Sequence, residues 1–266
     1  MTVPRLEFRN VTKRFAKSGK EGGAVIAIAG VSLSVANGEV VSLIGPSGCG
    51  KSTLLNLGSG LDQPTAGEVI VDGERVTKPN PHVAFMLQKD LLLPWRTILD
   101  NVAFGLEIQR RPGAARIARA HELLASLQLD DFANHYPHQL SGGMRQRVAL
   151  ARTLAVDPSV LLLDEPFSAV DAQTRMVLQR DLARTLKQAG KTALLITHDL
   201  AEAVLMADRV LVMSPRPGHI IDEIRIEMPH RDDPIARRQQ ARLGEYAAML
   251  MQRLHIGEAA AVEPAA

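Results

Sequence analysis

One segment near the start of the chain constrains its fold most strongly. Residues 45–52 read Gly-Pro-Ser-Gly-Cys-Gly-Lys-Ser and directly follow the apolar run Val40–Ile44. Glycines let successive backbone N–H groups curl around phosphates, and a helix starting behind them adds its positive N-terminal end. Lys51 is expected to reach the outer phosphates and Ser52 to ligate Mg²⁺. A merely flexible glycine turn is the alternative, and the predicted strand-to-helix context argues against it.

A second apolar run ends in two carboxylates. Val160–Leu163 is followed by Asp164 and Glu165, and ligands of open α/β sheets bind at the carboxyl ends of strands. Because side chains alternate along a strand, the two carboxylates point in different directions. Asp164 suits the coordination sphere of Mg²⁺, and Glu165 is placed to orient or deprotonate an attacking water. Capping of the next helix is the alternative use, which the phosphate loop makes the weaker one.

A second glycine-rich helix start is predicted at Leu140–Arg147. Ser141 is a natural N-cap, and Gly142 and Gly143 follow it. Such a helix start offers a second anion site. Taken alone, the pattern favours an ordinary capped helix.

The overall pattern is that of an α/β protein with a mostly parallel core sheet, because short apolar runs alternate with longer helical patterns. Buried strands are predicted where compact apolar runs are bounded by glycine, charge or turn residues, and the N-terminal runs favour antiparallel pairing. The predicted core strands are Val40–Ile44, Val160–Leu163, Ala193–Ile196 and Val210–Met213; the predicted antiparallel segments are Leu6–Val11, Ile26–Val35 and Glu68–Val71.

Helical patterns interrupt and follow this sheet. The strand pattern disappears after Thr97, which predicts an inserted α-helical subdomain at about residues 97–155. A helix is expected to begin at Pro234, behind acidic capping residues. We therefore divide the chain into a nucleotide domain over residues 1–225, a C-terminal helical extension over 226–256 and a disordered tail over 257–266.

Composition excludes several classes of protein. The 266 residues carry a net charge of only +2, which gives no reason to expect nucleic-acid binding. The single cysteine excludes a disulfide framework within the chain. No apolar run approaches the roughly 18 residues that span a bilayer, and no signal-peptide block precedes residue 10. We expect an intracellular protein that does not itself cross a membrane.

Read in order, these motifs resemble the ATP-binding cassette (ABC) family over about residues 5–225. The phosphate loop, Gln88, the Leu140–Gly143 signature, Asp164-Glu165, Ser168–Asp171 and His198 follow that family's order. The resemblance implies a phosphate-loop NTPase fold and an ATPase that uses ATP and Mg²⁺. It also implies a head-to-tail dimer in which the signature helix of one chain closes on ATP held by the other.

Site residues follow from the same resemblance. It places Phe15 against adenine, with a core Phe as the alternative, and Ser141 and Gly143 on the γ-phosphate in trans. Asp171 would communicate across the dimer. The catalytic assignments are Lys51, Gln88, Glu165 and His198; the Mg²⁺ ligands are Ser52, Gln88 and Asp164; the nucleotide-binding residues are Phe15, Gly45, Pro46, Ser47, Gly48, Cys49, Gly50, Lys51, Ser52, Thr53, Ser141, Gly142, Gly143 and Asp171.

Two departures from the family pattern leave this chemistry intact. Met144 replaces a common Gln at the end of the signature, and Val170 replaces a common Leu before Asp171. Neither removes a catalytic group. The presence of Lys51, Glu165 and His198 argues against a cassette that binds ATP without hydrolysing it.

Several shorter sequence segments resemble those of the nitrate, sulfonate and taurine importers of bacteria. The segments that carry this likeness are Leu92–Trp95, Thr97–Gly105, Tyr136–Gln139 and Ser214–Gly218. It implies separate transmembrane permease subunits, a periplasmic or extracellular solute-binding protein, and a peripheral position on the cytoplasmic face of the inner membrane. The alternative is a soluble ABC ATPase with a nucleic-acid-associated or regulatory role, since cassettes also serve DNA repair and translation.

One aromatic side chain is a candidate contact for the permease. Trp95 is the only Trp and lies in the apolar segment Leu91–Ile98, just after Gln88. Aromatic anchors are frequent hot spots of interfaces. Ordinary burial of Trp95 in the core is the competing prediction.

Overall fold

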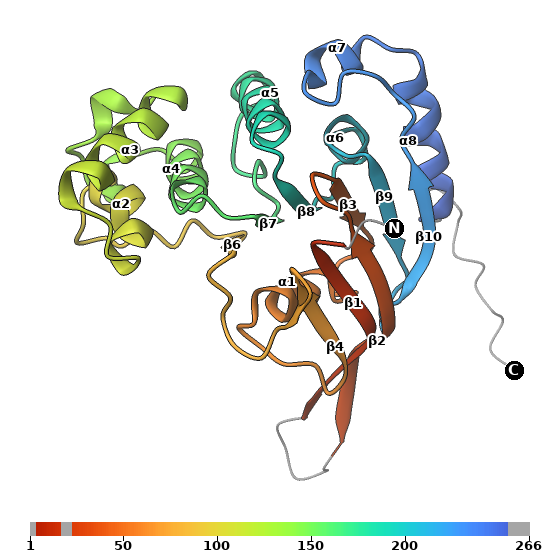
Figure 1. Ribbon diagram of the computed structural model, residues 1–266. Helices are drawn as coiled ribbons and strands as arrows, with labels where there is room; N and C mark the ends of the chain where they lie inside the picture. Colours follow the sequence, from red (N-terminus) through yellow and green to blue (C-terminus); the bar gives the residue numbers. More distant parts are fainter. Residues whose placement is uncertain (1–3, 17–22, 255–266) are drawn as a thin grey trace, which may run out of the picture.

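Two β-sheets with helices between and around them build the molecule (Figure 1). The computed structural model describes residues 4–16 and 23–254; the predicted tail at 257–266 lies outside the described residues. The larger sheet has the strand order β10-β9-β3-β8-β7-β6, parallel except for β10. Its strands are β3 (Val40–Ile44), β6 (Val83–Met86), β7 (Val160–Asp164), β8 (Thr192–Ile196), β9 (Arg209–Met213) and β10 (Ile220–Arg225).

The smaller sheet is antiparallel and N-terminal, as predicted. It has the order β2-β1-β4-β5, with β1 Leu6–Ala16, β2 Ala24–Val35, β4 Ala66–Val71 and β5 Glu74–Arg75. Helix α1 (Lys51–Ser59) lies between the two sheets, and its buried Leu54 and Leu57 share one core cluster with Phe8 of β1 and Leu162 of β7. This packing fixes the start of α1 at the edge of the larger sheet.

Three helices form a separate group at one end of the larger sheet, beyond β6 (Figure 1). They are α2 (Ile98–Ile108), α3 (Gly113–Ser126) and α4 (Gly142–Ala155). Thr97 caps α2 by accepting from the Asp100 N–H at 3.1 Å, and Ser141 caps α4 by accepting from the Met144 N–H at 3.3 Å. The strand pattern ends at residue 97 because this capped helix begins there.

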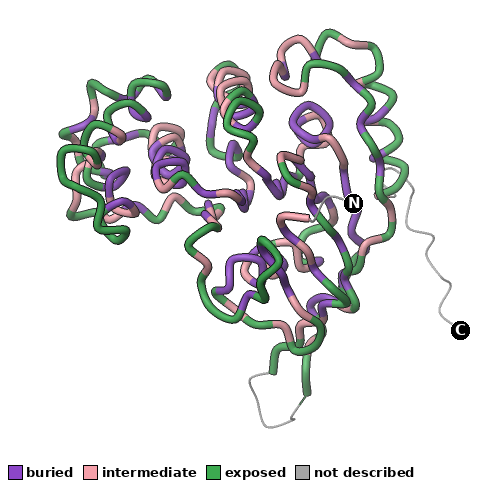
Figure 2. Tube along the Cα trace, in the orientation of Figure 1, coloured by how far each residue is buried: buried purple, intermediate pink, exposed green. Residues whose placement is uncertain are grey.

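Helices α5 (Ala172–Gln188) and α6 (Leu200–Met206) cover the face of the larger sheet opposite to α1. Figure 2 shows the burial that results, with the sheet strands and the inner sides of the helices buried and the outer turns exposed. None of the described helices is both long enough and apolar enough to cross a bilayer.

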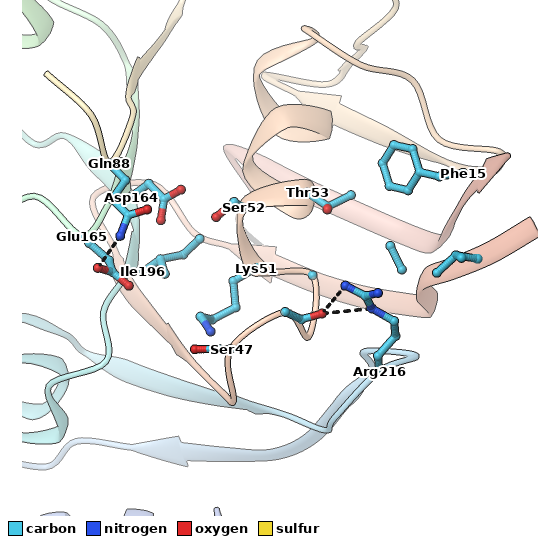
Figure 3. A pocket seen from close by; sticks show the side chains of 14 residues that line it. Phe15, Ser47, Lys51, Ser52, Thr53, Gln88, Asp164, Glu165, Ile196 and Arg216 are labelled. Atoms are coloured by element: carbon cyan, nitrogen blue, oxygen red, sulfur yellow. Dashed lines mark hydrogen bonds between the residues drawn. The ribbon is translucent and has the colours of Figure 1, made fainter. Parts of the chain in front are cut away.

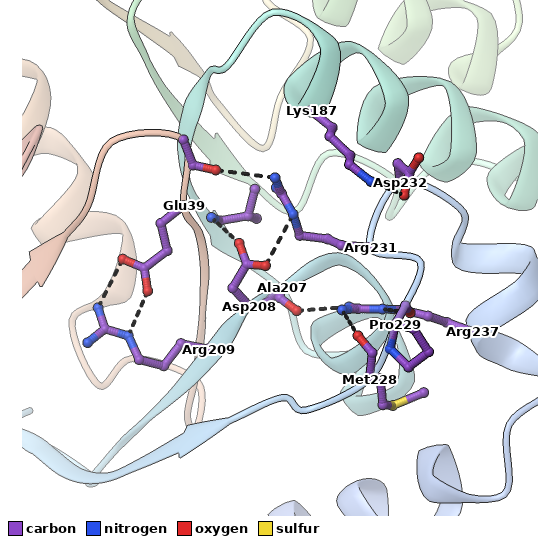
Figure 4. Close-up of polar contacts among 12 residues, drawn as sticks. Glu39, Lys187, Ala207, Asp208, Arg209, Met228, Pro229, Arg231, Asp232 and Arg237 are labelled. Carbon is purple, nitrogen blue, oxygen red and sulfur yellow. Dashed lines mark hydrogen bonds and ion pairs between the residues drawn. The ribbon is translucent and has the colours of Figure 1, made fainter.

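The C-terminal segment wraps over α6 as two helices, α7 (Pro234–Arg238) and α8 (Arg242–Arg253). Asp233 caps α7, which begins at Pro234 as predicted. Arg237 is only 2% exposed and donates to five backbone carbonyls; Figure 4 shows it beside Ala207, Met228 and Pro229. Three belong to the end of α6 and the residue after it, Val204, Leu205 and Ala207, and two to the segment before α7, Met228 and Pro229. Arg237 therefore joins the extension to the end of α6.

Candidate active site

Four parallel strands deliver the predicted site residues to one edge of the larger sheet. The phosphate loop follows β3, Gln88 follows β6, Asp164 ends β7, and His198 follows β8. Parallel strands end at the same edge, which is where open α/β sheets bind ligands. The topology thus brings together residues that are more than 150 positions apart in the sequence.

The phosphate loop itself is held tightly against the smaller sheet. Gly50 has a φ of +107°, and a Cβ there would lie 2.4 Å from the Ile28 Cγ2 atom, so only glycine fits. Lys51 Nζ donates to the carbonyls of Gly45 at 2.7 Å and Pro46 at 3.0 Å. The first N–H groups of α1 have no carbonyl partner within the helix, and a helix start of this kind favours a bound anion.

A cavity of about 510 Å³ opens above this loop (Figure 3). Phe15 lies at one end of it and Glu165 at the other, with the phosphate loop between them. This arrangement suits a nucleotide, with its base toward the half-exposed Phe15 ring and its terminal phosphate toward the carboxylates. The lining residues are Phe15, Val25, Ala27, Ser47, Gly48, Gly50, Lys51, Ser52, Thr53, Gln88, Asp164, Glu165, Ile196 and Arg216.

The two carboxylates occupy different environments: Asp164 is the last residue of β7, whereas Glu165 lies beyond the strand, so the predicted alternation along a strand does not apply to it. Asp164 is buried, and this burial raises the pKa of its carboxyl group, with a further contribution from Glu165, while the Ser52 hydroxyl and Lys51 oppose the increase. Glu165 has the unusual φ of +49°, and backbone strain of this kind gathers at functional sites. Its Oε2 accepts from Gln88 Nε2 at 2.9 Å and lies 3.3 Å from His198 Nδ1.

A buried acid lies behind His198. Glu202 of α6 accepts from the side chain of Gln179 at 3.1 Å, and burial raises the pKa of Glu202 to about 7. The hydrogen bond from Thr197, next to His198, opposes this increase. The carboxyl group of Glu202 lies in the same small pocket as Glu165 and His198.

The structure does not bring every predicted residue to this cavity. Ser141, Gly142 and Gly143 lie at the start of α4 in the helical group, and Asp171 caps α5 by accepting from the Thr174 N–H at 3.0 Å. Cys49 is only 1% exposed and does not line the cavity. Arg216 lines the cavity but was not assigned a role from the sequence, where it appears only within a likeness to importers.

Comparison with known proteins agrees with this geometry. A family model described as "ABC transporter" matches residues 28–168. The chain is 48% identical over 209 residues to the taurine import ATP-binding protein TauB of Burkholderia thailandensis, covering 79% of this chain and 80% of the relative. It is 48% identical over 239 residues to the aliphatic sulfonates import ATP-binding protein SsuB 1 of Xanthomonas axonopodis pv. citri, covering 90% and 94%.

A solved structure extends the likeness to three dimensions. A dimeric ATP-binding cassette in a post-hydrolysis state, bound to ADP and Pi, superposes with a TM-score of 0.76. It is 36% identical in sequence, and the match covers 84% of this chain and 99% of that one. The predicted α/β cassette fold and ATP as the nucleotide are thereby confirmed. The chain belongs to the ABC transporter family and is an ATP-hydrolysing cassette.

Proposed function

We propose that this chain is the ATPase subunit of an importer, and that two copies hydrolyse ATP between them to drive a separate transmembrane permease. The observation that carries the proposal is the loop between Gln88 and α2, in which the apolar side chains of Leu91 and Trp95 are exposed. Gln88, at the start of this loop, donates a hydrogen bond to Glu165. The relatives named as taurine and sulfonate import proteins support the direction of transport.

Hydrolysis is assigned to Glu165, which would polarise the attacking water. Gln88 donates to its Oε2 and His198 lies 3.3 Å from the same oxygen, and these contacts orient the carboxylate. Lys51 would leave its contacts with the loop carbonyls and bind the outer phosphates. His198, whose side chain is largely exposed at this edge, would contact the γ-phosphate.

The residues around Asp164 fit a magnesium ion. The Ser52 hydroxyl, the Asp164 carboxylate and the Gln88 amide oxygen are the oxygen donors that Mg²⁺ prefers. Asp164 is a buried carboxylate whose charge is disfavoured by burial, and a bound cation would offset that cost. Mg²⁺ held there would neutralise charge on the phosphates.

A second copy of the chain would complete the site. The α4 start, with Ser141 and Gly143, presents unpaired helix N–H groups on the surface of the helical group rather than in the chain's own cavity. Such a helix start binds phosphate, and the dimeric cassette structure shows that this fold pairs. We assign Ser141 and Gly143 to the γ-phosphate of the partner's ATP, and Asp171 to the same interface.

The loop behind Gln88 is held rigidly by two helices. Buried Asn101 of α2 accepts from the Leu93 N–H at 2.7 Å and donates to the carbonyls of Leu93, Arg96 and Thr97. From α4, Arg145 pairs with Asp90 at 3.0 Å, and Arg152 donates to the carbonyls of Asp90 and Leu91. Movement of α4 against a partner's ATP would therefore move this loop.

Trp95 is presented outward by this rigid loop and is 72% exposed, so the competing prediction of core burial is wrong. Leu91, four positions earlier in the same loop, is 54% exposed. Apolar side chains held outward on a rigid loop suit contact with a helix of a permease.

Replacing Trp95 by alanine should weaken association with the permease by about 2 kcal/mol or more, the usual effect of losing an aromatic hot spot. ATP affinity should stay unchanged, because Trp95 does not line the cavity. Binding is measured with detergent-solubilised permease, and Ile221→Ala, an exposed apolar residue on β10 at the far edge of the sheet, is the matched control. Equal permease affinity of the Trp95 variant and the parent would refute this docking assignment.

The transported solute is proposed to be a sulfonate, nitrate or taurine-like anion, delivered by an external binding protein, with this chain at the cytoplasmic face of the membrane. Purification of a tagged chain from its native host tests the role as a whole. A co-purifying permease supports it, whereas nucleic-acid fragments would favour a soluble ABC ATPase that acts on nucleic acid.

A further inference from the structure

A loop from the C-terminal part of the chain lies against the phosphate loop. Residues 214–219 connect β9 to β10, and Arg216 in this loop reaches the carbonyl of Gly48 with two N–H groups (Figure 3). The distances are 3.1 Å from Nε and 3.0 Å from an Nη atom. Arg216 also lines the nucleotide cavity. We call residues 214–219 the strap.

Backbone hydrogen bonds anchor the strap to β2. Gly218 N–H donates to the Ala27 carbonyl at 3.0 Å, and its own carbonyl accepts from the Ala29 N–H at 2.9 Å, so both groups are tied to β2. Ser214 and His219 close the base of the strap, with the Ser214 N–H donating to the His219 carbonyl at 2.9 Å. Arg216 is therefore held in place by backbone contacts of its neighbours.

The strap also touches the next carbonyl of the phosphate loop. A Cβ on Gly218 would lie 1.9 Å from the Cys49 carbonyl oxygen, so the strap backbone packs directly against it. The C=O and N–H of a trans peptide point in opposite directions. When the carbonyls of Gly48 and Cys49 point toward the strap, the N–H groups of the following residues, Cys49 and Gly50, point toward the interior of the loop. In agreement, the Cys49 N–H donates to the Pro46 carbonyl at 3.3 Å.

Charge adds to this geometric effect. Within residues 4–16 and 23–254, no carboxylate lies within ion-pair distance of Arg216. The positive charge of its guanidinium group is therefore not neutralised by a carboxylate. Arg216 also lines the nucleotide cavity, where the negatively charged phosphates of ATP would lie. Arg216 is exposed, so solvent screens its attraction to these phosphates, and the two hydrogen bonds to Gly48 are its main contribution.

We propose that Arg216 is a positioning residue for the nucleotide: it fixes the phosphate loop in its phosphate-binding conformation and sets the affinity for ATP and ADP, without acting on the water. The glycine-rich loop, with Gly48 at a φ of +74° and Gly50 at +107°, is intrinsically free to turn its peptides the other way. The Arg216 contact removes that freedom. The role differs from that of Lys51, which would bind phosphate itself.

Arg216→Ala should raise the KM for ATP and the Kd for MgADP by about tenfold, because two charge-assisted hydrogen bonds to the loop are lost. The kcat at saturating ATP should remain within about threefold of the parent, since Glu165, Gln88 and His198 are untouched. Arg216→Lys should restore part of the affinity, because an ammonium keeps the charge but not the fork of donors. Phosphate release and calorimetric titration with MgADP measure these quantities.

Arg225→Ala is the matched control, since Arg225 is an exposed arginine on the adjoining β10 and makes no side-chain hydrogen bond among the described residues. Unchanged KM and Kd in Arg216→Ala would overturn the proposal, and so would a fall in kcat at unchanged affinity. Should Arg216→Ala fail to fold, Arg216→Lys decides: wild-type thermal stability with weakened MgADP binding supports the proposal, and parental binding contradicts it.

Discussion

Glu165→Gln lowers steady-state ATP hydrolysis by about 10²- to 10⁴-fold, the usual result of removing a general base. Glutamine has almost the same size and can still accept from Gln88, so the cavity keeps its shape. Only the carboxylate that would act on water is lost. Binding of MgATP should be retained, because the phosphate loop and Asp164 are unchanged.

Phosphate release by purified protein measures this effect. Glu74→Gln, an exposed glutamate on β5, is the matched control and should keep the parental rate. Lys51→Ala provides a contrast, because it should weaken nucleotide binding as well as hydrolysis. If Glu165→Gln released phosphate at the parental rate, the base would have to be another group.

Arg237→Ala destabilises the folded protein by about 3 kcal/mol or more, since a buried polar group left unsatisfied costs roughly 1–3 kcal/mol and five carbonyls share this guanidinium. For a chain of this size, the thermal midpoint should fall by roughly 6 to 12 °C. Arg238→Ala, one position along on the exposed side of α7, should shift it little. Thermal unfolding followed by circular dichroism gives both values.

The same comparison tests what the C-terminal extension does. Arg237 is buried without a carboxylate within ion-pair distance among the described residues, and burial lowers the pKa of its guanidinium. Figure 4 shows it bridging α6 and the segment before α7, while Arg231 pairs with Asp208 nearby. Parental stability of Arg237→Ala would mean that water replaces the side chain and that the extension is not joined to α6 through it.

The core of the site was predictable because each of its motifs is local. A glycine loop directly after an apolar strand can be recognised from a few neighbouring residues, and so can two carboxylates at the end of another strand. The parallel pairing of these strands then brings the two motifs together. β6 was missed because it is only four residues long, Val83–Met86, and follows the turn at Pro81. β10 was missed because its charged residues Asp222, Glu223 and Arg225 obscure the apolar pattern.

Two arginines show what a sequence pattern cannot reveal. Arg216 contacts Gly48 across 168 positions of sequence, and nothing local in the strap predicts that partner. Arg237 lies in a polar stretch with Arg238 and two glutamines, which resembles an exposed helix end, yet its side chain is buried. Both depend on the packing of distant backbone carbonyls, which becomes visible only in the folded chain.

The most direct test of the central claim, that ATP is hydrolysed between two copies of this chain, is size exclusion of Glu165→Gln with and without MgATP. Slowed hydrolysis should trap the sandwich, so the account predicts a monomer without nucleotide and a dimer with it. Adding Ser141→Arg should abolish the dimer while each monomer still binds ATP at Lys51, because Ser141 lies outside the chain's own cavity. A Glu165→Gln protein that stays monomeric in saturating MgATP, or a double variant that still dimerises, would contradict the account.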